Sequence, residues 1–101
     1  MTFRKFADVM EKIGFGETET VEPFVKLDSK ILANPAMKNG YTKPEGTYRV
    51  ISMYSQKIKG KDHVALWIRR ITNPPESRIY PLFAEEVDFL VKRNCFKKEK
   101  L

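Results

Sequence analysis

Residues 46–72 read GTYRVISMYSQKIKGKDHVALWIRRIT, and they contain two runs rich in β-branched and aromatic side chains. Such side chains fit the pleated, half-buried surface of a sheet. We therefore expect strands at residues 47–54 and 63–72. A polar link at residues 57–62 should join them, with Gly60 placed for a tight turn.

A third, short strand is expected at residues 78–82, after a stretch at 73–77 whose two prolines exclude a strand interior. Pro81 indicates that this strand lies at an edge or an end of the sheet. Three strands joined by short links in this order predict an antiparallel meander.

Apolar side chains near the N-terminus recur at intervals of three and four residues, which is typical of an amphipathic helix. They are Phe3, Phe6, Val9, Met10 and Ile13. Thr2 is a suitable N-cap, because its hydroxyl can accept a hydrogen bond from the first turn. Gly14 suits the left-handed position that ends a helix. The pattern predicts a helix over residues 3–13.

The segment between this helix and the main strands is irregular. Residues 17–23 are acidic and extended, and a short strand is expected at 24–27. A helical turn over residues 30–33 can follow, capped by Asp28 or Ser29.

Residues 82–93 fit two structures. Apolar side chains there recur at helical spacing, but Val87, Phe89 and Val91 also alternate as they would in a closing strand. The acidic start at Ala84-Glu85-Glu86 and the length of the segment favour the helix. The charged tail at residues 95–101 is expected to fray.

Together these elements predict an α+β fold in a single domain, residues 1–101. An N-terminal helix precedes a small antiparallel sheet of three or four strands, curled toward a barrel, with a C-terminal helix or closing strand. Residues 1–43 form a helical and irregular extension, 44–94 the β-rich core and 95–101 the tail.

The charge of the chain is uneven. Nineteen Lys and Arg against thirteen Asp and Glu give a net charge of +6. Residues 1–28 carry −2, from four basic and six acidic side chains, and residues 29–101 carry +8, from fifteen and seven. Such a field favours a polyanion such as nucleic acid, or an acidic protein surface. A generic solubilising surface is the alternative explanation of the same excess.

Few features connect the chain with a membrane or with export. The longest apolar run, residues 64–68, is far shorter than the roughly 20 residues of a membrane span. The N-terminus lacks the apolar core of a signal peptide. A single cysteine, Cys95, suits a reducing compartment. We expect a cytoplasmic protein that makes no membrane contact.

Catalytic parts are scarce, and we expect neither an enzyme nor a bound cofactor or metal. The chain has one histidine, His63, and one cysteine, so a nucleophile pair requires that these two side chains meet in space. A zinc site needs about four ligands. Glu85, Glu86 and Asp88 are interpreted as an acidic helix start rather than a cation site.

Basic and aromatic side chains mix on the predicted strands and their link. Rings offer stacking surfaces for bases and cations neutralise phosphates, so this mixture is typical of sheet domains that hold single-stranded nucleic acid. The candidate binding residues are Arg49, Tyr54, Lys57, Lys59, Lys61, Trp67, Arg69 and Arg70.

Simple alternation assigns these residues to faces of the sheet. It puts Arg49 on one face of the first strand and Tyr54 on the other. In the second strand Val64, Leu66 and Ile68 form the better core face, which leaves Trp67 with Arg69 outward or against a helix. Coverage of Trp67 by the N-terminal helix, as ordinary core, is the alternative.

The strand rhythm also resembles that of SH3-like small barrels, including translation-factor-type modules. The resemblance covers residues 44–91 and is carried by Gly46-Thr-Tyr-Arg-Val-Ile, Val64-Ala-Leu-Trp-Ile, Ile79-Tyr-Pro-Leu and Glu86-Val-Asp-Phe-Leu. It implies a barrel that binds proline-rich peptides, RNA, DNA or protein partners. The acidic loop and paired tyrosines of peptide-binding SH3 domains are missing from this chain.

Two functional hypotheses follow. The first is a non-catalytic module that binds nucleic acid through its basic sheet face and hairpin, with affinity that falls as salt rises. The second is a small protein-interaction factor, such as an inhibitor or adaptor encoded by a phage or mobile element. Its contact surface would be Phe83, Val87, Phe89 and Leu90, or the acidic residues 17–22. A homodimer through the edge strand at 78–82 is a further possibility.

Overall fold

The protein has the expected α+β fold. A computed structural model describes residues 1–14, 23–38 and 40–98, so the predicted acidic loop at 17–22 lies outside the described residues. In chain order the elements are α1 (Phe3–Lys12), β1 (Phe24–Leu27), α2 (Ser29–Ala33), the 3-10 turn η1 (Pro35–Met37), β2 (Gly46–Ile58), β3 (Lys61–Arg70), β4 (Tyr80–Leu82), α3 (Ala84–Lys92) and β5 (Phe96–Lys97).

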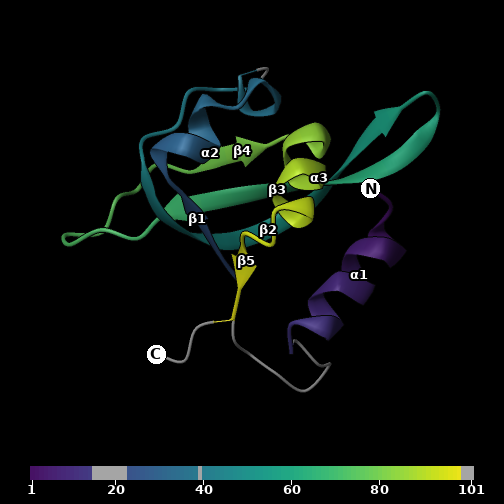
Figure 1. Ribbon diagram of the computed structural model, residues 1–101, viewed down its shortest axis with the longest axis horizontal. Coiled ribbons are helices and arrows are strands. Elements are labelled where there is room, and N and C mark those ends of the chain that lie inside the picture. Colours follow the sequence, from purple (N-terminus) through teal and green to yellow (C-terminus); the bar gives the residue numbers. More distant parts are fainter. Residues whose placement is uncertain (15–22, 39, 99–101) are drawn as a thin grey trace.

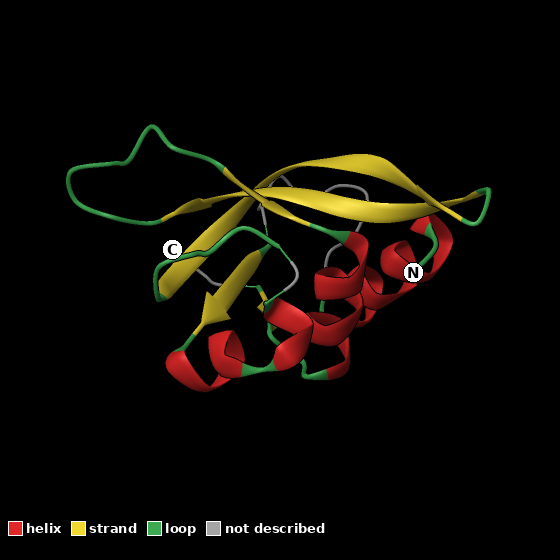
Figure 2. Ribbon diagram, turned by 90° about the horizontal axis from the view of Figure 1, so that it is seen from above, coloured by secondary structure: helices red, strands yellow, loops and turns green. Residues whose placement is uncertain are grey.

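One antiparallel sheet of five strands, in the order β4-β3-β2-β1-β5, forms the upper layer of the molecule. The helices lie on one side of it, as Figure 2 shows. Helix α3 follows β4 at one edge of the sheet and leads to β5 at the other edge (Figure 1). Because β4 and β5 lie at opposite edges, the sheet is open, and the predicted curling toward an SH3-like barrel does not reach closure.

Strands β2 and β3 form a hairpin longer than we expected. The polar residues at 57–62 continue the ladder, with Lys57 opposite Asp62 and Ile58 opposite Lys61. Only Lys59 and Gly60 make the turn, at φ values of 52° and 79°. Two consecutive positive φ angles match the right-handed twist of the flanking strands, so the ladder extends up to the turn.

The N-terminal helix confirms its sequence signals. The Thr2 hydroxyl accepts a hydrogen bond from the Lys5 amide at 3.3 Å, and Gly14 has a φ of 100° just after the helix. Its buried residue, Phe6, packs edge-on against Phe96, with ring centroids 5.8 Å apart. This contact fixes α1 beneath the sheet.

At the C-terminal end the helical alternative for residues 82–93 is confirmed by α3. The expected fraying of the tail is wrong for residues 96–98. Phe96 is 4% exposed and pairs with Val25 of β1, so it adds a fifth strand to the sheet. Burial of this one aromatic ring outweighs the charges around it.

A buried ion pair joins two parts of the fold. Lys43 Nζ lies 2.9 Å from Glu86 Oε2, and both side chains are 1% exposed. Lys43 also donates to the Tyr41 carbonyl at 2.9 Å, and the Phe83 amide donates to Glu86 Oε1 at 3.0 Å. The loop before β2 and the first turn of α3 are therefore held by one carboxylate.

Gly40 lies directly against this carboxylate. A Cβ atom at position 40 would lie 2.4 Å from Glu86 Oε1. That oxygen is fixed by its hydrogen bond to Phe83, so it has little freedom to move aside. Glycine is needed here because backbone approaches a buried charge closely.

Replacement of Lys43 by methionine should lower the free energy of unfolding by about 3–5 kcal/mol, because it leaves the Glu86 charge buried without its partner. The double variant Lys43→Met/Glu86→Gln should recover part of this loss, since no buried charge remains. Urea unfolding measures both. Lys57→Met, at the exposed hairpin, is the matched control and should change stability by less than about 0.5 kcal/mol. A Lys43→Met variant as stable as this control would contradict the role of the pair.

Tyr48 gives the fold a second testable feature. It is fully buried, its hydroxyl donates to the Pro44 carbonyl, and its ring packs edge-on against Tyr80, with centroids 5.7 Å apart. Burial, with a smaller contribution from Tyr80, raises the pKa of Tyr48 to about 12.

The neutral phenol of Tyr48 therefore stabilises the fold fully below about pH 10, the pKa of an unfolded tyrosine, and this contribution is lost as pH rises through the folded pKa. Wild-type stability should fall in this alkaline window more steeply than that of Tyr48→Phe, as measured by urea unfolding at several pH values. Tyr41→Phe, at an exposed ring, should follow the wild type. Identical alkaline curves for wild type and Tyr48→Phe would refute the assignment.

Candidate nucleic-acid interface

One face of the sheet carries no helix in the part of the chain that the structure describes (Figure 2). Val64, Leu66 and Ile68 of β3 are fully buried on the helix side, as expected. Alternation along β3 places Ala65, Trp67 and Arg69 on the opposite face. We call this opposite side the open face.

A β-bulge decides which residues of β2 reach the open face. The register between β2 and β3 shifts between Val50 and Ser52, so that Val50 faces Ile68 but Ser52 already faces Trp67. Tyr54 consequently lies opposite Ala65. Simple alternation had separated Arg49 from Tyr54, and that assignment is wrong because the extra residue Ile51 reverses the faces beyond it.

Two arginines occupy directly opposed positions on the open face. Arg49 pairs with Arg69 across β2 and β3. The Arg49 guanidinium lies 5.4 Å from the centre of the Phe24 ring, and Arg69 is exposed. Like charges at opposed positions of a sheet destabilise it. The pair concentrates positive charge at this point of the sheet.

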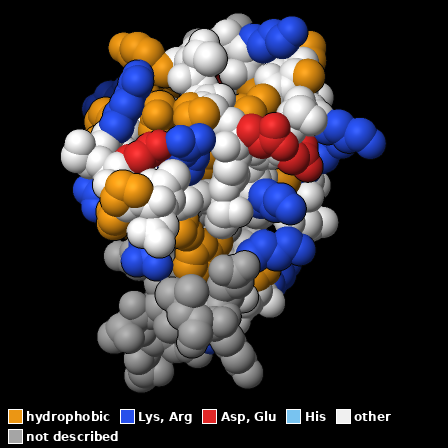
Figure 3. Space-filling view, turned by 90° about the vertical axis from the view of Figure 1, so that its left-hand side faces the viewer, with side chains coloured by type: hydrophobic (Ala, Val, Ile, Leu, Met, Phe, Trp, Pro, Cys, Tyr) orange, Lys and Arg blue, Asp and Glu red, His pale blue; other side chains and the backbone are white. Residues whose placement is uncertain are grey.

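A shallow hollow of about 480 Å³ lies beside this pair. It is lined by Arg49, Ile51, Arg69, Arg70, Ile71, Thr72 and Pro75. The side chains of Ile51 and Ile71 are 38% and 46% exposed. Figure 3, which views the end of the molecule that carries the loop at 71–79, shows Lys and Arg side chains spread around hydrophobic ones. The hollow thus combines cations with an apolar floor.

Arg70 is bonded to a carboxylate and to a backbone carbonyl of the protein. Its Nε lies 3.1 Å from Glu76 Oε1 and its Nη2 donates to the same oxygen. Nη1 lies 3.4 Å from the Glu45 carbonyl. The hydrogen bond that Arg70 donates to Glu76 raises the pKa of Arg70, so it stays charged.

The two aromatic candidates lie next to each other on the open face. The rings of Tyr54 and Trp67 are tilted by 33°, with centroids 5.3 Å apart. Both side chains are half-buried. The Trp67 ring packs on Tyr54, and the buried ring of the N-terminal helix, Phe6, packs on Phe96.

The three lysines lie at the far end of the hairpin. Lys57, Lys59 and Lys61 are all exposed, and the hairpin extends beyond the rest of the sheet (Figure 1). Lys57 lies eight positions along β2 from Arg49, about 26 Å at the rise of a strand. The structure brings together Arg49 and Arg69, and separately the aromatic pair, but leaves the lysines at a distance. Arg70 pairs with the buried Tyr48 and therefore lies on the other face of the sheet.

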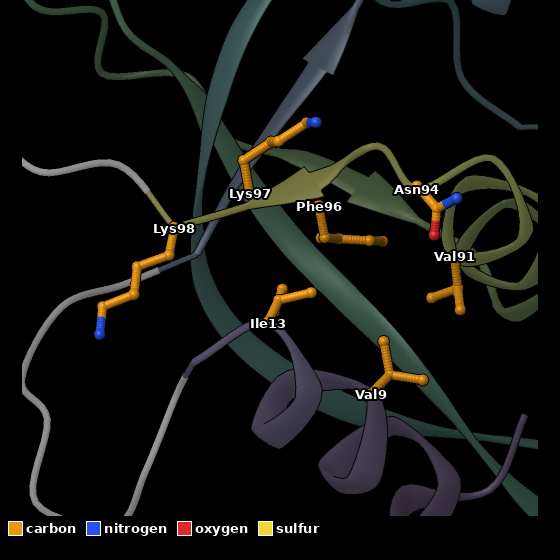
Figure 4. A pocket seen from close by; sticks show the side chains of 7 residues that line it. All are labelled: Val9, Ile13, Val91, Asn94, Phe96, Lys97 and Lys98. Atoms are coloured by element: carbon orange, nitrogen blue, oxygen red, sulfur yellow. The ribbon is translucent and has the colours of Figure 1, made fainter.

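A second pocket, of about 240 Å³, lies between α1, α3 and β5 (Figure 4). Its walls are mostly apolar, and it is lined by Val9, Ile13, Val91, Asn94, Phe96, Lys97 and Lys98. Lys98 Nζ donates to the Gly14 carbonyl at 2.9 Å, which ties β5 to the end of α1. This pocket contains none of the candidate binding residues predicted from the sequence.

The side chains expected to form the contact surface of a protein-interaction factor are largely buried. Val87 and Leu90 are fully buried in the core, and Phe83 and Phe89 are half-buried. A contact through these four side chains is therefore wrong, because α3 turns two of them onto the sheet. Sequence spacing had identified the helix but not which of its residues stay accessible.

The residues considered for chemistry are engaged separately. His63 Nδ1 lies 3.1 Å from the Met1 amine, and Cys95 Sγ lies 3.8 Å from the Arg93 carbonyl. Among the described residues, no group of three or more His, Cys, Asp or Glu is placed to hold a metal ion. Over the same residues, no helix is both long and apolar enough to cross a membrane.

Burial raises the pKa of the Cys95 thiol, with a smaller contribution from Asp28, so less thiolate is present at neutral pH. Cys95 should react with an aromatic disulfide reagent at pH 7 more slowly than a small free thiol, and its rate should rise with pH. The released thiolate can be followed by absorbance. A reaction faster than that of the free thiol would reopen the question of a nucleophile.

Neither a family model nor a curated protein or solved structure matches this chain. The likeness of residues 44–91 to SH3-like barrels stays a resemblance of strand rhythm.

Proposed function

We propose that this protein binds nucleic acid, in single-stranded form, on the open face of its sheet. The observation that carries the proposal is the cross-strand pair of Arg49 and Arg69 beside a hollow. Two arginines at directly opposed positions concentrate positive charge at one place on the sheet, and both line the hollow. Phosphate is a natural ligand for guanidinium groups, because their planar forks match its oxygens.

The aromatic pair adds the second element of such a site. Trp67 lies two residues before Arg69 in β3, so the two side chains are neighbours on the same face of the sheet. Base stacking on aromatic rings tolerates any sequence and contributes about 1–3 kcal/mol per base. A single-stranded nucleic acid whose phosphate contacts Arg69 can stack a neighbouring base near Trp67 and Tyr54.

The hairpin lysines extend the positive surface away from the arginines. A flexible single-stranded nucleic acid can extend from the hollow toward the hairpin, with its phosphates near the arginines at one end and the lysines at the other. Asp62, opposite Lys57 and bonded to the Ser55 hydroxyl at 2.9 Å, offsets part of the charge there. We assign the hairpin a supporting role in affinity and the hollow the central role.

Docking of an acidic protein is the second candidate, favoured by the exposed Ile51 and Ile71 in the hollow. In both candidate functions the arginines bind the anionic partner, but an acidic protein offers no bases to stack on Trp67. Trp67 emission therefore separates the two.

Fluorescent single- and double-stranded oligonucleotides, titrated at low and physiological salt, test the proposal. Single strands should bind more tightly, quench Trp67 and lose affinity as salt rises, because phosphate contacts release counterions. Arg69→Gln should weaken binding and reduce the slope of log K against log salt by about 0.7, the value for one phosphate contact on a single strand.

Lys5→Gln, at an exposed position of α1, removes the same charge away from the open face and should change the slope little. Absence of binding at low salt would overturn the proposal, as would binding that ignores ionic strength. Tighter binding of duplex without quenching of Trp67 would overturn the single-strand assignment.

A further inference from the structure

The register of the sheet places a further cation on the open face, at the edge strand β5. Lys97 of β5 pairs with Phe24 of β1, and Phe24 pairs with Arg49 of β2. Arg49 in turn faces Arg69 of β3. Residues that lie directly opposite each other on neighbouring strands share one face of a sheet. These four side chains therefore form one line across four strands, which we call the cross-strand row.

The side chain of Lys97 is exposed and is turned away from the helices. Figure 4 shows it on the other side of the β5 ribbon from the side chains of Phe96 and Lys98. Phe96 packs on Phe6 of α1, and Lys98 Nζ donates to the Gly14 carbonyl at the end of that helix. Because both neighbours in the chain face the helix side, Lys97 faces the open side, as the register requires.

A second row, beside the first, adds one more cation to the open face. Lys26 lies two residues after Phe24 in β1, about 7 Å away on the same face, and its side chain is exposed. Its partner on β2 is Thr47, whose carbonyl accepts the Ile71 amide at 2.8 Å. The structure describes every position of these two rows, and none of them is acidic.

Phe24 fixes the centre of the cross-strand row. Its ring is 3% exposed, and the Arg49 guanidinium lies 5.4 Å from the ring centre. Electrostatic attraction to the ring restricts the position of such a cation. Arg49 is therefore held between Lys97 and Arg69 before a ligand arrives, which lowers the cost of ordering it on binding.

We propose that a bound single-stranded nucleic acid crosses the sheet along this row, from β3 to β5, with phosphates at Arg69, Arg49 and Lys97. Arginine and lysine side chains both bind phosphate oxygens. The inference rests on the proposed function and deepens it, because it gives the path of the ligand and adds Lys97 as a phosphate-binding residue, with Lys26 beside it. The row spans three steps between strands of about 4.8 Å each, about 14 Å in all. A short ligand bound along it does not reach the hairpin lysines.

The test is Lys97→Gln, titrated with a fluorescein-labelled oligothymidylate of about five nucleotides, near the lower end of the site sizes of single-strand-binding sheet folds. The variant should bind about three- to tenfold more weakly than wild type, and the slope of log K against log salt should fall by about 0.7, because one phosphate contact is lost. The double variant Arg69→Gln/Lys97→Gln should lower the slope by about 1.4, since two contacts are lost.

Two controls remove the same charge elsewhere. Lys92→Gln is at an exposed position of α3, on the helix side of the sheet, and should change the affinity and the slope little. Lys57→Gln, at the hairpin, should also affect this short ligand less than Lys97→Gln does. Circular dichroism checks that each variant is folded, and quenching of Trp67 by unlabelled oligothymidylate should persist in Lys97→Gln.

The outcomes separate the path of the ligand from the proposed function. If Lys97→Gln binds as Lys92→Gln does, while the wild type binds and its Trp67 is quenched, the path is overturned and the proposed function stands. A larger loss for Lys57→Gln than for Lys97→Gln would overturn the path as well, because the ligand would then follow the hairpin. Absence of binding by the wild type at low salt would instead overturn the proposed function, and the inference with it.

A measurement on the wild type needs no substitution. On addition of the same oligothymidylate, the backbone amide resonances of Lys26 and Lys97 should shift together with that of Arg69, whereas that of Gly60, at the hairpin turn, should stay in place. Salt-dependent binding that leaves the resonances of β1 and β5 unmoved would overturn the path across the sheet.

Discussion

The buried ion pair of Lys43 and Glu86 is the constraint on which the architecture depends. Both charged groups are 1% exposed, in a chain of 101 residues with one small core. The Glu86 carboxylate also accepts the Phe83 amide and leaves room only for a glycine at position 40. Gln56 completes the junction by accepting the Ala84 amide at 2.9 Å. The start of α3 is therefore bonded both to the loop before β2 and to β2 itself.

This junction explains why the helices gather on one side of the sheet. With α3 fixed at the end of β4, its apolar residues Val87 and Leu90 pack onto the sheet, and β5 is carried to the opposite edge. Phe6 of α1 then packs against Phe96 of β5. The same arrangement leaves the other face of β2 and β3 without a helix among the described elements, and there the charges collect.

Much of the fold could be predicted from local patterns. The caps at Thr2 and Asp28, the three main strands, the edge position of Pro81 and helix α3 followed from spacing and residue type. Two features did not. The two-residue turn at Lys59 and Gly60 was obscured by flanking polar residues, and β5 by its charged neighbours. In both places backbone pairing, which leaves little trace in composition, outweighed polarity.

The candidate site divides in the same way. The sequence by itself determined that arginines, lysines and aromatic rings lie on two adjacent strands, because strand propensity and charge are local properties. Only the tertiary structure decided which of them meet. The bulge at Ile51 moved Tyr54 to the side of Arg49, the register set Arg49 opposite Arg69, and the loop brought Glu76 to Arg70. These contacts depend on register and loop path, which arise when the whole chain packs and are not encoded at any single residue.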